Sequence, residues 1–176
     1  ERAMANVDDV DEVLRGERGA GAGKRIGFFL LALAPVAVPV LVYARVLGMD
    51  LSKSVVALAG GSLATAVALS LAYYNIAFCQ EVKLEADAAP PTKGSFGKKK
   101  SEYEAAVKAH GGRIKTAALM YSVFYNNLIY LFGAVLLAAY VVNNKVSLEL
   151  SFLVSNGVAV AFALFNSVTA VKQLHA

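Results

Sequence analysis

The hydrophobic and polar residues of this chain are segregated into long blocks. Four blocks contain no Asp, Glu, Lys, Arg or His, and they cover residues 26–44, 55–78, 117–142 and 150–171. A helix rises about 1.5 Å per residue, so about 20 apolar residues cross a hydrocarbon core of about 30 Å. Because lipid offers no partners to backbone polar groups, each block is predicted to be a transmembrane helix.

The predicted fold class is an all-α membrane protein, with four transmembrane helices and a short helical cytosolic loop between the second and third. The composition agrees, since 57% of the residues are hydrophobic and the mean hydropathy is +0.55. The predicted order is an N-terminal segment, a first transmembrane hairpin, a basic loop, a second hairpin and a C-terminal end, at residues 1–25, 26–78, 79–116, 117–171 and 172–176.

The basic residues are distributed unevenly around these blocks. Of the 17 Lys and Arg residues, 14 lie before the first block, between the second and third, or after the fourth. The other three, Arg45, Lys53 and Lys145, lie in or next to the two short links. Cytosolic segments carry an excess of Lys and Arg, so both termini and the 79–116 loop are predicted to be cytosolic.

The 79–116 loop contains its own start and stop signals. The second helix is expected to continue to Asp87, where Pro90-Pro91 break the chain. Ser101 and Glu104 form a capping-box pattern that predicts the start of a short helix, and Gly111-Gly112 predict its end.

Small residues recur at every fourth position in two of the blocks. Such rows let helices approach closely, so they are predicted to pack on each other or on a partner subunit, with internal packing favoured. The rows are Gly60, Ala64, Ala68 and Ala72 in the second block, and Ser155, Ala159, Ala163 and Ser167 in the fourth.

A few other residues interrupt the apolar blocks. Asn126 and Asn127 lie well inside the third block, and amides buried in a membrane find partners on other helices. Asn75 in the second block is the expected mate. Pro35 and Pro39 each remove a backbone donor from the first block, which predicts a kink there.

Catalytic and metal-binding patterns are not found in the sequence. The blocks carry no ionisable side chains of the kind that intramembrane catalysts and ion carriers use. The two histidines, His110 and His175, have no neighbours at metal-ligand spacing. We therefore expect no enzyme activity and no cofactor. A small membrane transporter or channel subunit is the main alternative, followed by a lipid-modifying or lipid-moving protein.

The basic cluster in the loop has two possible ligands. Arg113 and Lys115 lie next to the third block, where they suit anionic lipid headgroups. Lys98, Lys99 and Lys100 lie farther from the membrane and suit the phosphates of a nucleic acid, which would make binding sensitive to salt. The residue pattern alone leaves both readings open.

Several short segments resemble one known family, the gamma subunit of the translocon-associated (signal sequence receptor) complex of the endoplasmic reticulum. The resemblance covers about residues 25–170. The matching segments are Tyr43 with Arg45, Met49-Asp50-Leu51 with Ser54, Ala72-Tyr73 with Asn75 and Phe78, and Ser122 with Phe124-Tyr125-Asn126-Asn127.

The resemblance implies a location, a function and partners. It implies a non-catalytic, multi-pass protein of the endoplasmic reticulum membrane with both termini cytosolic. Its basic loop would dock the ribosome at the Sec translocon channel during co-translational translocation, touching rRNA and a protein of the large ribosomal subunit. Companion alpha, beta and delta subunits are the further partners implied, and membrane lipids are the partner that the charge pattern already indicates. The residues expected at the ribosome are Lys98, Lys99, Lys100, Lys108, Arg113 and Lys115.

Overall fold

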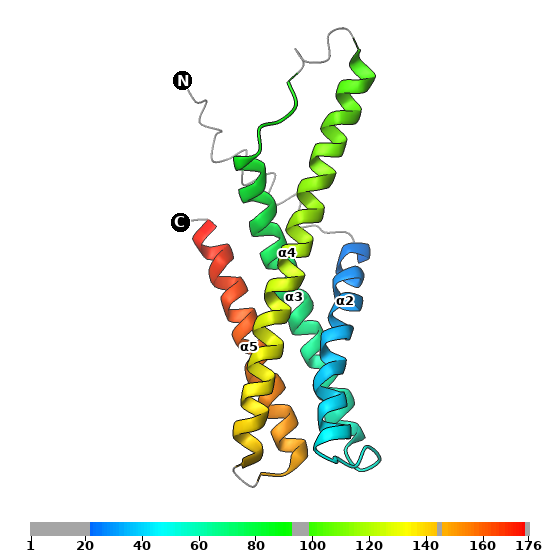
Figure 1. Ribbon diagram of the computed structural model, residues 1–176, viewed down its shortest axis with the longest axis vertical. Helices are drawn as coiled ribbons and strands as arrows, with labels where there is room; N and C mark the ends of the chain where they lie inside the picture. The colour runs from blue at the N-terminus through cyan, green and yellow to red at the C-terminus, as the bar shows by residue number, and fades with distance from the viewer. Residues whose placement is uncertain (1–21, 93–98, 144–145, 175–176) are drawn as a thin grey trace.

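The computed structural model describes residues 22–92, 99–143 and 146–174, which form a bundle of long helices (Figure 1). All four predicted spans lie in helices that are long and apolar enough to cross a membrane, which confirms the predicted fold class. The elements are α2 (Ala22–Leu41), the π-helical turn η1 (Val42–Val46), α3 (Val55–Asp87), α4 (Lys100–Asn143) and α5 (Leu148–Leu174). Most of the predicted segment 1–25 lies outside the described residues.

The first span is α2 together with η1. Both Pro35 and Pro39 are buried, and the chain remains α-helical through them. Regular geometry is lost three residues after Pro39, where the amide of Leu47 donates to the carbonyl of Val42 over 3.1 Å. The kink at the two prolines stays a prediction, and the irregularity that the structure shows in this span is the π turn after Pro39. Gly48, with φ of 71°, then reverses the chain.

The prediction that a short loop helix ends at Gly111-Gly112 is wrong. α4 is continuous over 44 residues and passes through both glycines. Glycine lowers helix stability by about 1 kcal/mol per residue, but it ends a helix mainly by adopting a positive φ. Among the described glycines, Gly48 is the one with a positive φ, so Gly111 and Gly112 continue the helix. The start was also misplaced, because α4 begins at Lys100 and Ser101 is already helical.

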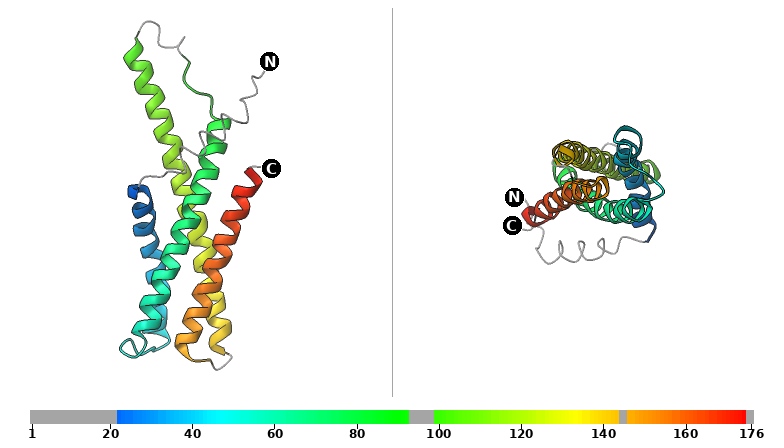
Figure 2. Two further views of the ribbon diagram at one scale, coloured as in Figure 1. Left: turned by 180° about the vertical axis from the view of Figure 1, so that it is seen from behind. Right: turned by 90° about the horizontal axis from the view of Figure 1, so that it is seen from below.

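The helices on both sides of the loop continue beyond their apolar blocks. α3 continues to Asp87 as expected, and α4 begins 17 residues before its apolar block at residue 117. Since those residues are helical, they add about 25 Å to the length of α4. Figures 1 and 2 show the first turns of α4 standing clear of the other described helices.

The buried faces of the helices carry mainly small and polar residues. On α4 every fourth residue from 114 to 138 is buried, and α5 shows the same four-residue spacing of buried residues. Spacing of this kind brings backbones close together. The buried series on α4 is Ile114, Ala118, Ser122, Asn126, Tyr130, Ala134 and Ala138.

The outer faces carry the large apolar residues. Phe124, Phe132 and Phe165 are 71%, 65% and 69% exposed within the isolated chain. Soluble monomers rarely expose apolar surface of this extent. Small and polar residues inside, with aromatic and aliphatic residues outside, are the distribution expected when lipid surrounds the protein.

Two adjacent glycines on α3 provide a test of this packing. A Cβ atom at Gly61 would lie 2.8 Å from Cδ2 of Leu153, whereas one at Gly60 would meet nothing within 4 Å. We expect Gly61→Leu to lower the free energy of unfolding by about 1–3 kcal/mol through overpacking against α5. Gly60→Leu is the matched control and should unfold like the parent in a steric-trapping or denaturant titration in detergent. Equal effects of the two substitutions would show that Gly61 does not face α5 more closely than Gly60 does.

Candidate functional site

The basic residues expected at the ribosome are spread along the protruding part of α4. Lys98 lies outside the described residues, Lys99 directly precedes α4, and Lys100 is its first residue. Lys108, Arg113 and Lys115 follow on the same helix. The structure therefore places most of the predicted set on one rigid element.

The lysines of α4 share a face of the helix. At about 100° per residue, Lys100, Lys108 and Lys115 fall within about 80° of one another, and Arg113 lies about 160° from Lys115. Lys100, Lys108 and Arg113 are all exposed. Arg113 thus belongs to a different surface from the three lysines.

The two lysines at the start of α4 form ion pairs with acids of the same helix. Lys99 lies 2.9 Å from Glu102 and Lys100 lies 3.8 Å from Glu104, measured from Nζ to Oε1. The lysine side chains remain 70% and 88% exposed. Exposed pairs of this kind contribute about 0–1 kcal/mol, so both lysines stay available to a stronger anionic partner.

Lys115 has a different environment from the other lysines. Its Nζ lies 3.5 Å from Oε1 of Glu81 on α3, and the Glu81 side chain is only 19% exposed. This ion pair joins α3 to α4 where the charged segment meets the apolar block.

The two asparagines of the third block bond to α3 and to their own helix. Asn127 accepts a hydrogen bond from the hydroxyl of Tyr73, and Asn126 donates to the backbone carbonyls of Ser122 (2.9 Å) and Ala72 (3.5 Å). The expected pairing with Asn75 is wrong, because Asn75 donates to Ser167 on α5 over 3.1 Å. Among the described residues the side-chain oxygen of Asn126 has no hydrogen-bond partner.

Further polar contacts inside the bundle were not anticipated from the sequence. The hydroxyl of Tyr130 on α4 donates to Asn156 on α5 over 2.6 Å. The hydroxyl of Tyr43 in η1 lies 2.8 Å from the Ser151 hydroxyl and 3.2 Å from that of Ser155. All of these side chains are at least 98% buried. A buried tyrosine in an apolar block needs a partner for its hydroxyl, and this was the signal available in the sequence.

The two rows of small residues differ in their placement. The α5 row is buried in the bundle, with Ser155, Ala159, Ala163 and Ser167 each at most 3% exposed. On α3, Gly60 and Ala64 are exposed, Ala68 is half-buried and Ala72 is buried. The close contacts of α5 are instead with Gly61 on α3 and with Gly133 on α4. A Cβ atom added at Gly133 would lie 3.4 Å from the Ala159 Cβ.

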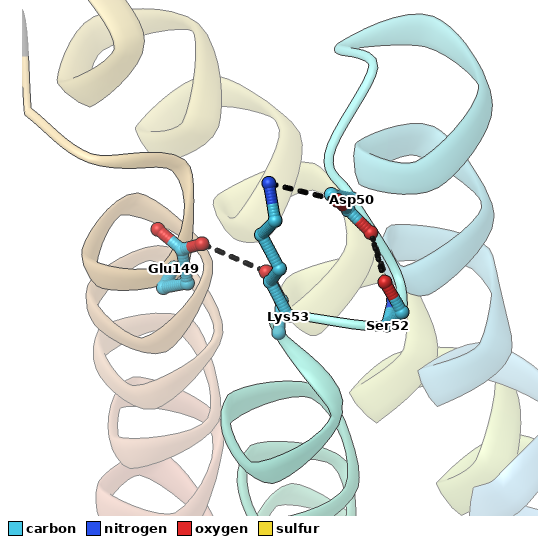
Figure 3. Close-up of polar contacts among 5 residues, drawn as sticks. Asp50, Ser52, Lys53 and Glu149 are labelled. Atoms are coloured by element: carbon cyan, nitrogen blue, oxygen red, sulfur yellow. Dashed lines mark hydrogen bonds and ion pairs between the residues drawn. The ribbon is translucent and has the colours of Figure 1, made fainter.

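At the opposite end of the bundle, polar contacts lie within the first link and between that link and the start of α5 (Figure 3). Asp50 accepts bonds from the amide and hydroxyl of Ser52 (3.0 and 2.7 Å) and lies 3.4 Å from Lys53. The bond from the Ser52 hydroxyl is the main reason that the pKa of Asp50 is lowered. The Ser54 hydroxyl donates to Glu149 at the start of α5 over 2.7 Å. These contacts hold the first link in place and attach it to the start of α5.

Metal chemistry finds no support in the described residues. No group of three or more His, Cys, Asp or Glu side chains lies close enough within them to hold a metal ion. Cys79 is a free thiol that is only 2% exposed.

These observations define a class of protein: a multi-pass helical membrane protein, stabilised by polar contacts between helices, with a basic helical extension at one end. The family described as "Translocon-associated protein, gamma subunit (TRAP-gamma)" matches residues 22–169. A similar protein is the translocon-associated protein subunit gamma of Dictyostelium discoideum, which is 26% identical over 173 residues, covering 93% of this chain and 97% of the relative. The chain belongs to the translocon-associated protein gamma family.

The buried hydroxyl of Tyr43 provides a test of the polar contacts. Tyr43→Phe removes the bonds to Ser151 and Ser155 and keeps the ring, which packs on Phe152 with centroids 5.2 Å apart. We expect the free energy of unfolding in detergent to fall by about 0.6–2 kcal/mol. Tyr121→Phe is the control, because Tyr121 is 47% exposed and stacks on Tyr125. An unchanged stability in Tyr43→Phe would contradict a role for these bonds in joining η1 to α5.

Proposed function

We propose that this chain is a non-catalytic subunit of a translocon-associated complex in the endoplasmic reticulum membrane, and that it docks the ribosome at the protein-conducting channel. Membership of the gamma family supports the complex and the location. The observation that carries the docking role is the basic extension of α4, in which 17 helical residues, Lys100 the first of them, precede the apolar block over a length of about 25 Å.

A continuous helix is well suited to this contact. A flexible loop would lose conformational freedom when its lysines bound a surface, whereas α4 already fixes their height and spacing. The exposed side chains of Lys100 and Lys108 face one side of the helix, and rRNA offers a dense array of phosphates. Anchoring in the membrane raises the effective concentration, so a weak contact suffices beside the contact made by the channel itself.

The proposed orientation places the α4 extension and both termini in the cytosol. It follows from the excess of Lys and Arg in the N-terminal segment, the 79–116 loop and the C-terminal end over the two short links. The two links, with Arg45, Lys53 and Lys145, then face the lumen. The exposed Gly60 and Ala64 on α3 offer a companion alpha, beta or delta subunit a close approach within the membrane.

The transporter alternative receives less support from the bundle. No Asp, Glu, Lys, Arg or His lies in the four apolar blocks. The asparagines inside the blocks bond within the bundle: Asn75 to α5, Asn127 to α3, and Asn126 to α3 and to its own helix. Intramembrane transport sites normally present polar groups to a cavity.

Charge changes at the start of α4 test the docking role in two directions. Reversing Lys98, Lys99 and Lys100 to Glu should weaken ribosome co-sedimentation of the purified complex and reduce its salt dependence, because up to three phosphate contacts are lost. Glu102→Gln with Glu104→Gln should strengthen binding, since it frees Lys99 and Lys100 from their ion pairs. The charge-matched control reverses Arg45, Lys53 and Lys145 at the other end. Binding that is unaffected by the first change, or equally reduced by the control, would reject docking through these lysines.

Cysteine labelling tests the proposed orientation separately. Cys79 is buried, so a cysteine introduced at Ser101 or Lys53 supplies the accessible thiol. In sealed microsomes a membrane-impermeant maleimide should label Ser101→Cys, while Lys53→Cys should react only after detergent is added. The reverse pattern would place the α4 extension in the lumen and exclude a contact with cytosolic ribosomes.

A further inference from the structure

A cleft of about 300 Å³ opens between α2, α3 and α4 at the basic end of the bundle. Its rim carries three charged side chains, Lys24 from α2, Glu81 from α3 and Lys115 from α4. Below the rim its walls are apolar and come from the same three helices. The wall includes Gly27, Phe28, Leu31, Phe78 and Leu119.

The charged and apolar residues of this cleft lie at different depths. Lys24 precedes the first apolar block by two residues, Lys115 precedes the third by two, and Glu81 follows the second by three. All three charges therefore lie at the level where the hydrocarbon core meets the lipid headgroups. Phe28, Leu31 and Leu119 lie deeper, inside the apolar blocks. The cleft has the polarity profile of a phospholipid, with a charged entrance and an apolar interior.

The charges at the rim favour an anionic ligand. Lys115 is paired with Glu81 at 3.5 Å, whereas Lys24 is exposed and forms no ion pair within the described ranges. One uncompensated cation and a second cation held beside it are complementary to a phosphate group. The volume is at the small end of ligand pockets, so it suits part of one lipid molecule.

We propose that this cleft binds one anionic glycerophospholipid, with its phosphate between Lys24 and Lys115 and the upper part of an acyl chain against Phe28, Leu31 and Leu119. The proposal rests on the membrane location of the bundle and is independent of ribosome docking. Arg113 lies on the opposite face of α4 from Lys115 by helix geometry, and it takes no part in this site. The bound lipid would join α2 to α4 in the same way that Glu81 joins α3 to α4.

Native mass spectrometry of the purified full chain in detergent tests this site. The chain is titrated with phosphatidylserine, phosphatidylcholine or soluble glycerol phosphate. We expect one equivalent of phosphatidylserine to bind at least about tenfold more tightly than phosphatidylcholine, as a charge-assisted contact allows. Glycerol phosphate should bind too weakly to detect. Equal retention of the two lipids would overturn the proposal, and glycerol phosphate binding as tightly as phosphatidylserine would show a phosphate site without a lipid chain.

Variants separate the headgroup contact from the acyl-chain contact. Lys24→Gln with Lys115→Gln should abolish the preference for phosphatidylserine, and Glu81→Gln should tighten phosphatidylserine binding severalfold by freeing Lys115. Gly27→Leu should reduce binding of the lipid, because Gly27 lines the cleft and a Cβ atom added there meets nothing within 4 Å. Gly60→Leu is the matched control at an exposed glycine of α3, and it should bind like the parent. The proposal fails if the lysine variants keep the preference, or if Gly27→Leu binds like Gly60→Leu.

Discussion

A polar group inside a lipid bilayer has no water to bond, and this constraint decides how the four helices are arranged. Small residues let helices approach, but they do not fix rotation or register. The hydroxyls and amides that bond across helices do, because each of these bonds requires one particular partner within reach. Tyr43 joins the first span to α5, Tyr73 and Asn127 join α3 to α4, and Tyr130 and Asn156 join α4 to α5.

The same contacts position the part of the chain that carries the basic residues. The membrane portion of α4 is bonded to α3 on one side and to α5 on the other, and the ion pair between Glu81 and Lys115 adds a contact where the helix leaves the bundle. The 17 residues of α4 that precede the apolar block are a continuation of that fixed helix. The positions of Lys100 and Lys108 are therefore fixed relative to the bundle. The buried network thus positions the proposed ribosome contact.

The spans could be predicted because they depend on a single property, the length of an uncharged apolar block. The predicted start of the second block coincides with the start of α3 at Val55. The continuity of α4 could not be predicted, since Gly111 and Gly112 are compatible both with a helix end and with a weakened helix interior. Whether the helix ends or continues there depends on the φ angles of the two glycines, which the sequence does not give.

The contacts between helices were also hard to predict, because they depend on the rotation of each helix about its own axis. Gly60 and Gly61 are neighbours in sequence but lie about 100° apart around α3, and only Gly61 meets α5 closely. Asn75 was matched with the asparagines of α4, whereas it bonds to Ser167 on α5. The partners of Tyr43 are more than 100 residues away in sequence, and several serines in the fourth block were equally plausible. Bundle contacts of this kind require the three-dimensional arrangement.

Site-specific photo-crosslinking in native membranes with bound ribosomes shows whether the α4 extension touches the ribosome. A photoreactive residue at Ala105, which is exposed on the α4 extension, is compared with one at Leu51 in the link at the opposite end. We expect adducts from position 105 to rRNA or a protein of the large ribosomal subunit, and no ribosomal adducts from position 51. Ribosomes that remain bound without any adduct from position 105, or that crosslink to position 51, would contradict the proposed docking.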